Sequence, residues 1–127
     1  MSVRRAARKT AAAPVVTRAP TPELLERVAL RFRALAEPAR LAVLHALEDG
    51  EHTVTELVDL TGLTQGNVSK HLQQLYAAGF VTRRREGLFV QYALADDGVL
   101  QLCALMCDRL DVDVAVERAV LEGARRR

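Results

Sequence analysis

The chain has 127 residues, of which 50% are apolar and 4% are aromatic, so it suffices for one modest hydrophobic core in a single domain. Its formal net charge is only +2, which excludes a globally basic protein and leaves charge to act locally. No run of eighteen apolar residues is present and the N-terminus lacks the apolar segment of a secretory signal, so we expect no membrane association and a cytosolic location.

Both ends of the chain are predicted to lie outside the folded domain. Residues 1–20 contain five basic residues, no acidic residue and no apolar period, which is typical of a disordered basic tail. The domain is expected over residues 21–124, followed by a frayed tail over residues 125–127.

Two scaffold helices are predicted before residue 50. The first begins at Thr21 and Pro22, a capping residue followed by proline at the first helical position, and its apolar stripe continues to Leu35. The second helix is expected from Pro38 to about Asp49. Its buried positions are Leu41, Leu44 and Leu47.

Residues 53–79 predict two short helices joined by a tight turn, a helix-turn-helix. Thr53 and Glu56 have the spacing of a capping box, Gly62 allows the positive φ of a sharp turn, and Thr64 caps the second helix. The core face of that helix carries Val68, Leu72 and Leu75. The opposite face carries Gln65, Ser69, Lys70 and Gln73. Such polar groups suit base edges and phosphates, although an ordinary solvated helix face is the alternative.

After Gly79 the apolar pattern changes from helical to alternating, which predicts a β-hairpin with its turn at Glu86 and Gly87. Three arginines, Arg83, Arg84 and Arg85, lie near its tip. Directly behind a helix-turn-helix, such a hairpin is a wing that can clamp phosphates. The alternative is an edge hairpin that charge protects from aggregation.

A last helix is predicted to begin near Gly98 with Asp97 as its cap. Its first turns read VLQLCALMCDRL, which is apolar around most of the circumference. Since a protein of this size cannot enclose such a helix, we expect it to pair with the same helix of a second subunit. Twofold symmetry then sets two recognition helices ~34 Å apart on a pseudo-palindromic site.

Cys103 and Cys107 lie four residues apart on one face of this helix and can offer two thiolates to a soft metal ion or metalloid. A closed site needs further ligands, so no cofactor is certain. The alternative is that both cysteines are small apolar packing residues. No catalytic residues are predicted, because Ser69 and His71 point in different directions and no carboxylate pair or phosphate loop accompanies them. We expect His71 to lie in the core.

Three stretches resemble the ArsR/SmtB family of winged-helix repressors, namely ALAEPARLAVLHAL (residues 34–47), LTQGNVSKHLQQLYAAGFV (residues 63–81) and RREGLFVQYAL (residues 84–94). The resemblance implies a mostly α-helical winged helix-turn-helix with a β-hairpin wing that dimerises through its terminal helices. It also implies a homodimer that binds double-stranded operator DNA and releases it when an inducer, classically a metal ion or metalloid, is sensed.

The resemblance further assigns individual residues. It carries Gln65, Gly66, Ser69, Lys70 and Gln73 over to base and phosphate contact, and the turn from Arg84 to Gly87 over to the wing. With Thr64 and Arg83, which the helix and hairpin patterns place beside them, the expected DNA-binding residues are Thr64, Gln65, Gly66, Ser69, Lys70, Gln73, Arg83, Arg84, Arg85 and Gly87. The best-known inducer sites of the family are missing: residues 56–60 contain no cysteine, and Arg109 and Val112 stand where a zinc sensor has ligands. Three possibilities follow: a divergent soft-metal site at Cys103 and Cys107, a thiol-reactive sensor at the same residues, or a regulator without a small-molecule inducer. The alternative function is a winged-helix protein-interaction module.

Overall fold

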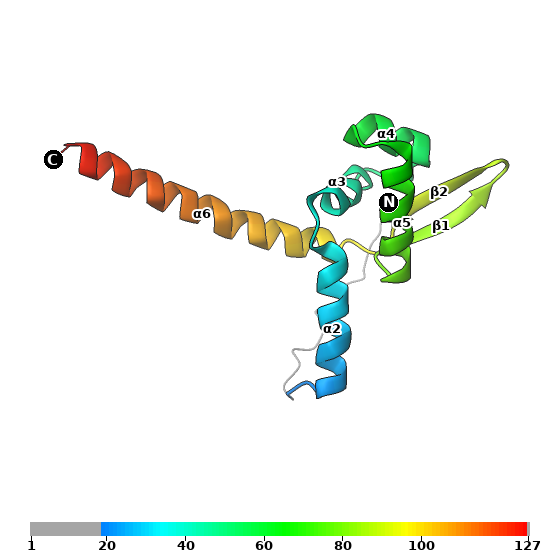
Figure 1. The fold of residues 1–127 in the computed structure, drawn as a ribbon, viewed down its shortest axis with the longest axis horizontal. Coiled ribbons are helices and arrows are strands. Elements are labelled where there is room, and N and C mark those ends of the chain that lie inside the picture. The colour runs from blue at the N-terminus through cyan, green and yellow to red at the C-terminus, as the bar shows by residue number, and fades with distance from the viewer. Residues whose placement is uncertain (1–18, 127) are drawn as a thin grey trace.

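The computed structural model describes residues 19–126, so most of the predicted tail over residues 1–20 lies outside the described residues. In chain order the elements are α2 (Pro22–Leu35), α3 (Pro38–Ala46), α4 (Val54–Thr61), α5 (Gln65–Ala77), β1 (Val81–Glu86), β2 (Phe89–Leu94) and α6 (Gly98–Arg126). Helices α3, α4 and α5 cluster together with the hairpin beside them, while α2 and α6 extend away in two different directions (Figure 1). The predicted mostly helical fold with a hairpin wing is thereby confirmed. No helix within residues 19–126 combines the length and apolar character that crossing a membrane requires.

Three helices begin at the threonines that the sequence indicates. The hydroxyls of Thr21, Thr53 and Thr64 each accept a hydrogen bond from the backbone amide three residues later, at 3.1, 3.2 and 3.2 Å. Glu56 completes the capping box of α4, because its Oε1 accepts from the Thr53 amide at 2.8 Å. Gly62 ends α4 with φ 75°, a left-handed conformation that glycine adopts without steric cost. The predicted helix-turn-helix is therefore confirmed.

Helix α3 ends at Ala46, earlier than the predicted Asp49. The amides of Leu47 and Glu48 each donate to the carbonyl three residues back, at 3.1 Å, so the last turn is tighter than an α-helix. Gly50 follows this turn and has a φ of 140°. The apolar pattern continues through this tight turn, which is why periodicity alone placed the end too late.

The hairpin turn lies one residue later than predicted. Glu86 pairs with Phe89, which leaves Gly87 and Leu88 as the loop instead of Glu86 and Gly87. Gly87 has φ 62°, the positive value that the first position of a short hairpin loop requires.

Helix α6 begins at Gly98 as expected, but the side chain that caps it is not Asp97. Oδ1 of Asp96 accepts from the Gly98 amide at 2.8 Å, while Asp97 accepts through its backbone carbonyl. The helical backbone continues to Arg126 and therefore includes part of the predicted frayed tail.

The core lies between α3, α4, α5 and the start of β1. Its buried apolar residues are Leu35, Val43, Leu44, Leu47, Leu57, Val68, Leu72, Leu75, Phe80, Val81 and Val99. The predicted core positions of α5 are confirmed, whereas Leu41 of α3 is only partly buried. A single helix-turn-helix core therefore fixes the rotation of α5 about its axis.

The terminal helices contribute little to this core. Helix α2 buries Leu35 and α6 buries Val99. Large apolar side chains of α2 that remain exposed are Leu24, Leu25, Val28, Leu30 and Phe32. Those of α6 are Leu105, Met106, Leu110, Val112, Val116, Val120 and Leu121. Apolar surface of this extent on two projecting helices is typical of a protein–protein interface.

Candidate nucleic-acid interface

The outward face of α5 brings the predicted contact residues together. The inner face of α5 is buried in the core, which turns the opposite face toward solvent. On that face the side chains of Gln65, Lys70 and Gln73 are exposed, and Ser69 is partly buried. Gly66 is exposed in the first turn, and apart from its chain neighbours and the backbone of its own helix no atom of residues 19–126 lies within 4 Å of where a Cβ would be. Together with the capping residue Thr64, these positions form one polar surface without a large apolar side chain, which we name the α5 face.

His71 holds α5 from its inner side. The Nε of Arg40 donates to His71 Nδ1 at 3.2 Å, so this ring nitrogen acts as the acceptor. Arg40 also donates to the Ala34 carbonyl at 3.3 Å, and Glu37 Oε2 lies 3.7 Å from both Arg40 Nε and His71 Nδ1. The predicted core role of His71 is confirmed, and the cluster ties α5 to the junction of α2 and α3.

The hairpin is attached to the segment that precedes α4. The His52 amide donates to the Tyr92 carbonyl at 3.0 Å, and the Tyr92 amide donates to the His52 carbonyl at 2.9 Å. This short antiparallel bridge adds residue 52 to the edge of β2. The base of the wing is thus fixed to the helix-turn-helix through the backbone.

The three wing arginines lie in three different environments. The Arg83 guanidinium stacks over the Tyr76 ring of α5, 4.0 Å from its centroid. Arg84 makes a two-pronged contact with Glu51: its Nε donates to Oε2 at 2.7 Å and its Nη2 donates to Oε1 at 2.6 Å. Its Nη1 donates to Oε2 of Glu86 at 3.2 Å. Arg85 is exposed and forms no ion pair or hydrogen bond through its side chain with any residue from 19 to 126.

The contacts between Arg84 and Glu51 shift the pKa of both side chains. Hydrogen bonding to Glu51, and then to Glu86, raises the pKa of Arg84 above its usual range. The hydrogen bonds that Glu51 accepts from Arg84 lower the pKa of the Glu51 carboxyl. The sequence analysis did not identify Glu51 or Tyr76 as partners of the wing arginines. Glu51 and Arg84 are 33 residues apart, and no local sequence pattern marks such a pair.

Cys103 and Cys107 line a groove of about 340 Å³ between the end of α2, α3 and α6. The wall is otherwise apolar except for His45. Cys103 is half-buried and Cys107 is exposed, and burial followed by the neighbouring Cys107 raises the pKa of the Cys103 thiol. Residues 19–126 contain no group of three or more histidine, cysteine or acidic side chains arranged to hold a metal ion. One chain therefore brings the two thiols together without completing a metal site.

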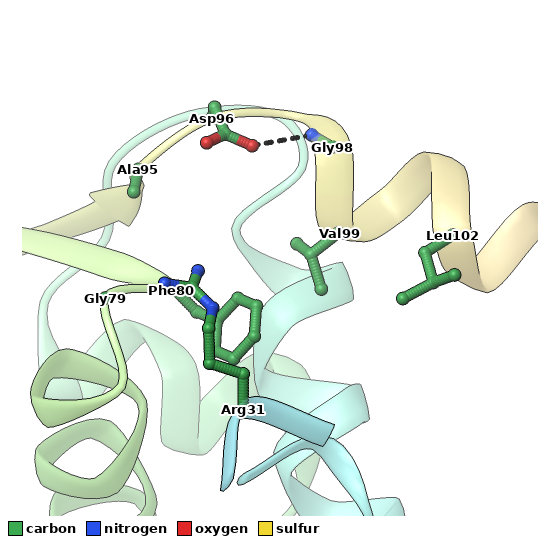
Figure 2. Close-up of a pocket in the computed structure, with 8 residues that line it drawn as sticks. All are labelled: Arg31, Gly79, Phe80, Ala95, Asp96, Gly98, Val99 and Leu102. Atoms are coloured by element: carbon green, nitrogen blue, oxygen red, sulfur yellow. Dashed lines mark hydrogen bonds between the residues drawn. The ribbon is translucent and has the colours of Figure 1, made fainter. Parts of the chain in front are cut away.

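A second, smaller pocket marks the joint between the terminal helices and the rest of the domain. Figure 2 shows Arg31 reaching from α2 toward Phe80 and Gly79, with Val99 and Leu102 projecting from α6 on the other side. The Arg31 guanidinium lies 4.5 Å from the Phe80 ring centroid. Because Phe80 lies in the short connection between α5 and β1, this joint links α2 and α6 to both parts of the predicted contact surface.

Comparison with known proteins identifies relatives for this arrangement. A family model described as "Bacterial regulatory protein, arsR family" matches residues 37–83. The "Probable mercury resistance operon repressor" of Streptomyces lividans is 42% identical over 74 residues, which are 58% of this chain and 59% of that protein. The "HTH-type transcriptional repressor SmtB" of Mycobacterium tuberculosis is 42% identical over 83 residues, 65% of this chain and 62% of the relative. The matches thus span about 60% of the length of these curated relatives.

Solved structures extend the similarity to the fold. A homodimeric winged helix-turn-helix DNA-binding domain from Mycobacterium bovis, described as a possible ArsR-family transcriptional regulator, is 36% identical, with a TM-score of 0.64. The match covers 72% of this chain and 85% of that one. The transcriptional repressor BigR from Xylella fastidiosa is 31% identical with a TM-score of 0.58, covering 68% of this chain and 93% of that one. From its sequence and its winged helix-turn-helix fold, the chain belongs to the ArsR family of bacterial regulatory proteins.

Proposed function

We propose that the protein is a homodimeric transcriptional repressor that places α5 in the major groove of double-stranded DNA and the wing along the flanking backbone. The observation that supports this most directly is the α5 face, a rigidly oriented row of amides, a hydroxyl and one cation beside an arginine-bearing hairpin. The residues proposed to form the DNA-facing surface are Thr64, Gln65, Gly66, Ser69, Lys70, Gln73, Arg83, Arg84, Arg85 and Gly87. A pseudo-palindromic operator and a cytosolic location belong to the same proposal.

DNA binding is tested with a duplex selected from a random-sequence library and with a mixed-sequence duplex as competitor. We expect the logarithm of the binding constant to fall linearly with the logarithm of salt concentration, with a slope of ~0.9 for each phosphate contacted. Gln65→Ala and Gln73→Ala should change the selected sequence, because amides read base edges. Binding that does not respond to salt, or no binding to any duplex, would favour the protein-interaction module instead.

We also propose that Cys103 and Cys107 receive the inducer, a soft metal ion, a metalloid or sulfane sulfur. The shared groove between α3 and α6 supports this, because binding there would alter how α6 packs on the domain. Two thiols do not make a closed metal site, and no third histidine, cysteine or acidic side chain of residues 19–126 is arranged to complete it, so further ligands would come from the second subunit. Thiols must lose their protons to bind a metal, so metal affinity should increase with pH, and the raised pKa of Cys103 extends this increase to higher pH.

The inducer proposal is tested by release of DNA from the wild type, Cys103→Ser and Cys107→Ser in the presence of Hg²⁺, Cd²⁺, arsenite or a polysulfide. We expect the wild type to release DNA with at least one agent and both variants to stay bound. Normal release by both variants would assign the cysteines to packing. A wild type that responds to none of these agents would indicate a regulator without such an inducer.

A further inference from the structure

We propose that the Glu51–Arg84 ion pair positions the wing, and that Arg85 is the wing arginine whose charge is available to a DNA phosphate. The inference rests on the proposed DNA binding and divides the three arginines that the sequence places together. It makes Glu51, which lies outside both the α5 face and the wing, a positioning residue for DNA binding.

The segment of residues 51 and 52 holds both strands of the hairpin. It holds β2 through the two backbone hydrogen bonds between His52 and Tyr92. It holds β1 through the two-pronged contact between Glu51 and Arg84. A planar guanidinium bound to both carboxylate oxygens has a defined orientation, which a single-point contact lacks. Each attachment therefore restricts the movement of the hairpin relative to α4, and the loss of either one leaves the wing less firmly held.

The charge of Arg84 is already matched by Glu51 and Glu86. A phosphate could take over the three hydrogen bonds of this guanidinium only by displacing both carboxylates. Arg83 stacks on Tyr76 and thereby braces the wing against α5. Arg85 is next to the tip, on the opposite face of the strand from Arg84, and has no side-chain partner in the part of the chain that the structure describes.

The exposed Glu51–Arg84 pair should add little to the stability of the fold, since ion pairs of this kind are weak in water. Its loss should instead be visible in DNA affinity, because a loosened wing must be ordered again each time DNA binds. We therefore expect Glu51→Gln and Arg84→Gln to fold normally.

The test compares the salt dependence of binding to one selected duplex for the wild type, Glu51→Gln, Arg84→Gln, the double variant and Arg85→Gln. Arg85→Gln should lower the slope by ~0.9, the value for one lost phosphate contact. Glu51→Gln and Arg84→Gln should keep the wild-type slope and weaken binding by a similar factor, up to roughly fivefold. The double variant should be no weaker than either single variant, because both remove the same attachment.

Two control variants separate position from charge. Glu48→Gln removes an exposed carboxylate that forms no ion pair with residues 19–126, and so measures the general effect of one negative charge less. Arg84→Lys keeps the charge but cannot reproduce the two-pronged contact, so we expect it to bind as weakly as Arg84→Gln.

The inference alone is overturned if the wild type binds with a steep slope, Arg84→Gln lowers that slope as Arg85→Gln does, and Glu51→Gln tightens binding beyond Glu48→Gln. That result would mean that Arg84 leaves Glu51 to bind phosphate. A wild type that shows no salt-dependent binding to any duplex would overturn the proposed function and this inference together.

Discussion

Thr53 determines where the first helix of the helix-turn-helix begins. Its hydroxyl accepts from the Glu56 amide at 3.2 Å, and its amide donates to the Glu56 carboxylate at 2.8 Å, so two backbone donors at the start of α4 have partners. Thr53→Ala removes the first of these bonds and should lower the free energy of unfolding by about 1 kcal/mol. Urea denaturation at one fixed protein concentration measures this, because the stability of a dimer depends on concentration.

The control for this prediction is Thr55→Ala, an exposed threonine in the first turn of the same helix. Alanine has the higher helix propensity, so Thr55→Ala should leave stability unchanged or slightly increased. Equal losses in Thr53→Ala and Thr55→Ala would contradict a capping role for Thr53.

The two cysteines should differ in reactivity. Cys107 is exposed, whereas Cys103 is half-buried and has a pKa that burial raises, so less of it is thiolate at a given pH. Iodoacetamide should therefore modify Cys107 first at neutral pH, and the modification of Cys103 should keep accelerating as pH rises past the usual titration range of a thiol. Peptide mass spectrometry of the reduced protein follows both sites. Faster modification of Cys103 would show that the groove is more open than its geometry indicates.

The difference between Thr53 and Arg84 explains which residue roles the sequence could predict. A capping residue and its partner lie three residues apart in the sequence. The short motif that forms the hydrogen bond can therefore be recognised in the sequence itself. Arg84 meets Glu51 only after the hairpin has folded back onto the segment before α4. The sequence therefore reveals a cluster of cations but not the environment of each one.

At the scale of elements, the positions of the helices were predictable wherever a cap or a glycine marks an end. Helix α5 and its buried face follow from the apolar period between Thr64 and Gly79. The end of α3 and the hairpin turn were each misplaced, because hydrogen-bond register decides them and apolar pattern does not. Boundaries set by main-chain pairing are the part of this fold that periodicity cannot locate.

Gly62 and Gly66 offer a matched test of the turn and the recognition helix. Apart from chain neighbours and, at Gly66, the backbone of its own helix, no atom of residues 19–126 lies within 4 Å of a Cβ at either position. Only Gly62 has a positive φ, at 75°. Gly62→Ala should therefore destabilise the protein by roughly 1 kcal/mol through backbone strain. Gly66→Ala should stabilise it by a comparable amount, since alanine is the better helix former.

The same pair separates folding from DNA contact. If Gly66 lies against DNA, a methyl group there should weaken binding although the protein melts at a higher temperature. Thermal melts and DNA titrations of both variants measure the two effects. A Gly66→Ala variant that is more stable and binds DNA as the wild type does would remove Gly66 from the contact surface.

At the scale of the whole molecule, one chain buries its helix-turn-helix but not its terminal helices. Figure 1 shows α2 and α6 projecting from the domain, and Arg31, Phe80 and Val99 form the joint where they meet it. A homodimer would cover the exposed apolar faces of these helices, as twofold assembly of this family implies. Movement of α6 at this joint would then change the separation of the two α5 helices, and operator affinity depends on that separation. The sequence predicted the need for a partner surface, but it could not give the angle at which α2 and α6 project.

Leu105→Glu tests this assembly directly. Leu105 is 60% exposed in one chain, so a carboxylate there leaves the folded core intact. In a dimer built through α6, the same carboxylate would be buried without a partner, which is strongly unfavourable. We expect sedimentation velocity to show a folded monomer, and DNA affinity to fall at least tenfold because two linked half-sites become two separate ones. Gln101→Glu, at an exposed polar position of the same helix, should remain dimeric. A Leu105→Glu protein that stays dimeric with wild-type affinity would place the subunit interface elsewhere, with the exposed face of α2 as the next surface to test.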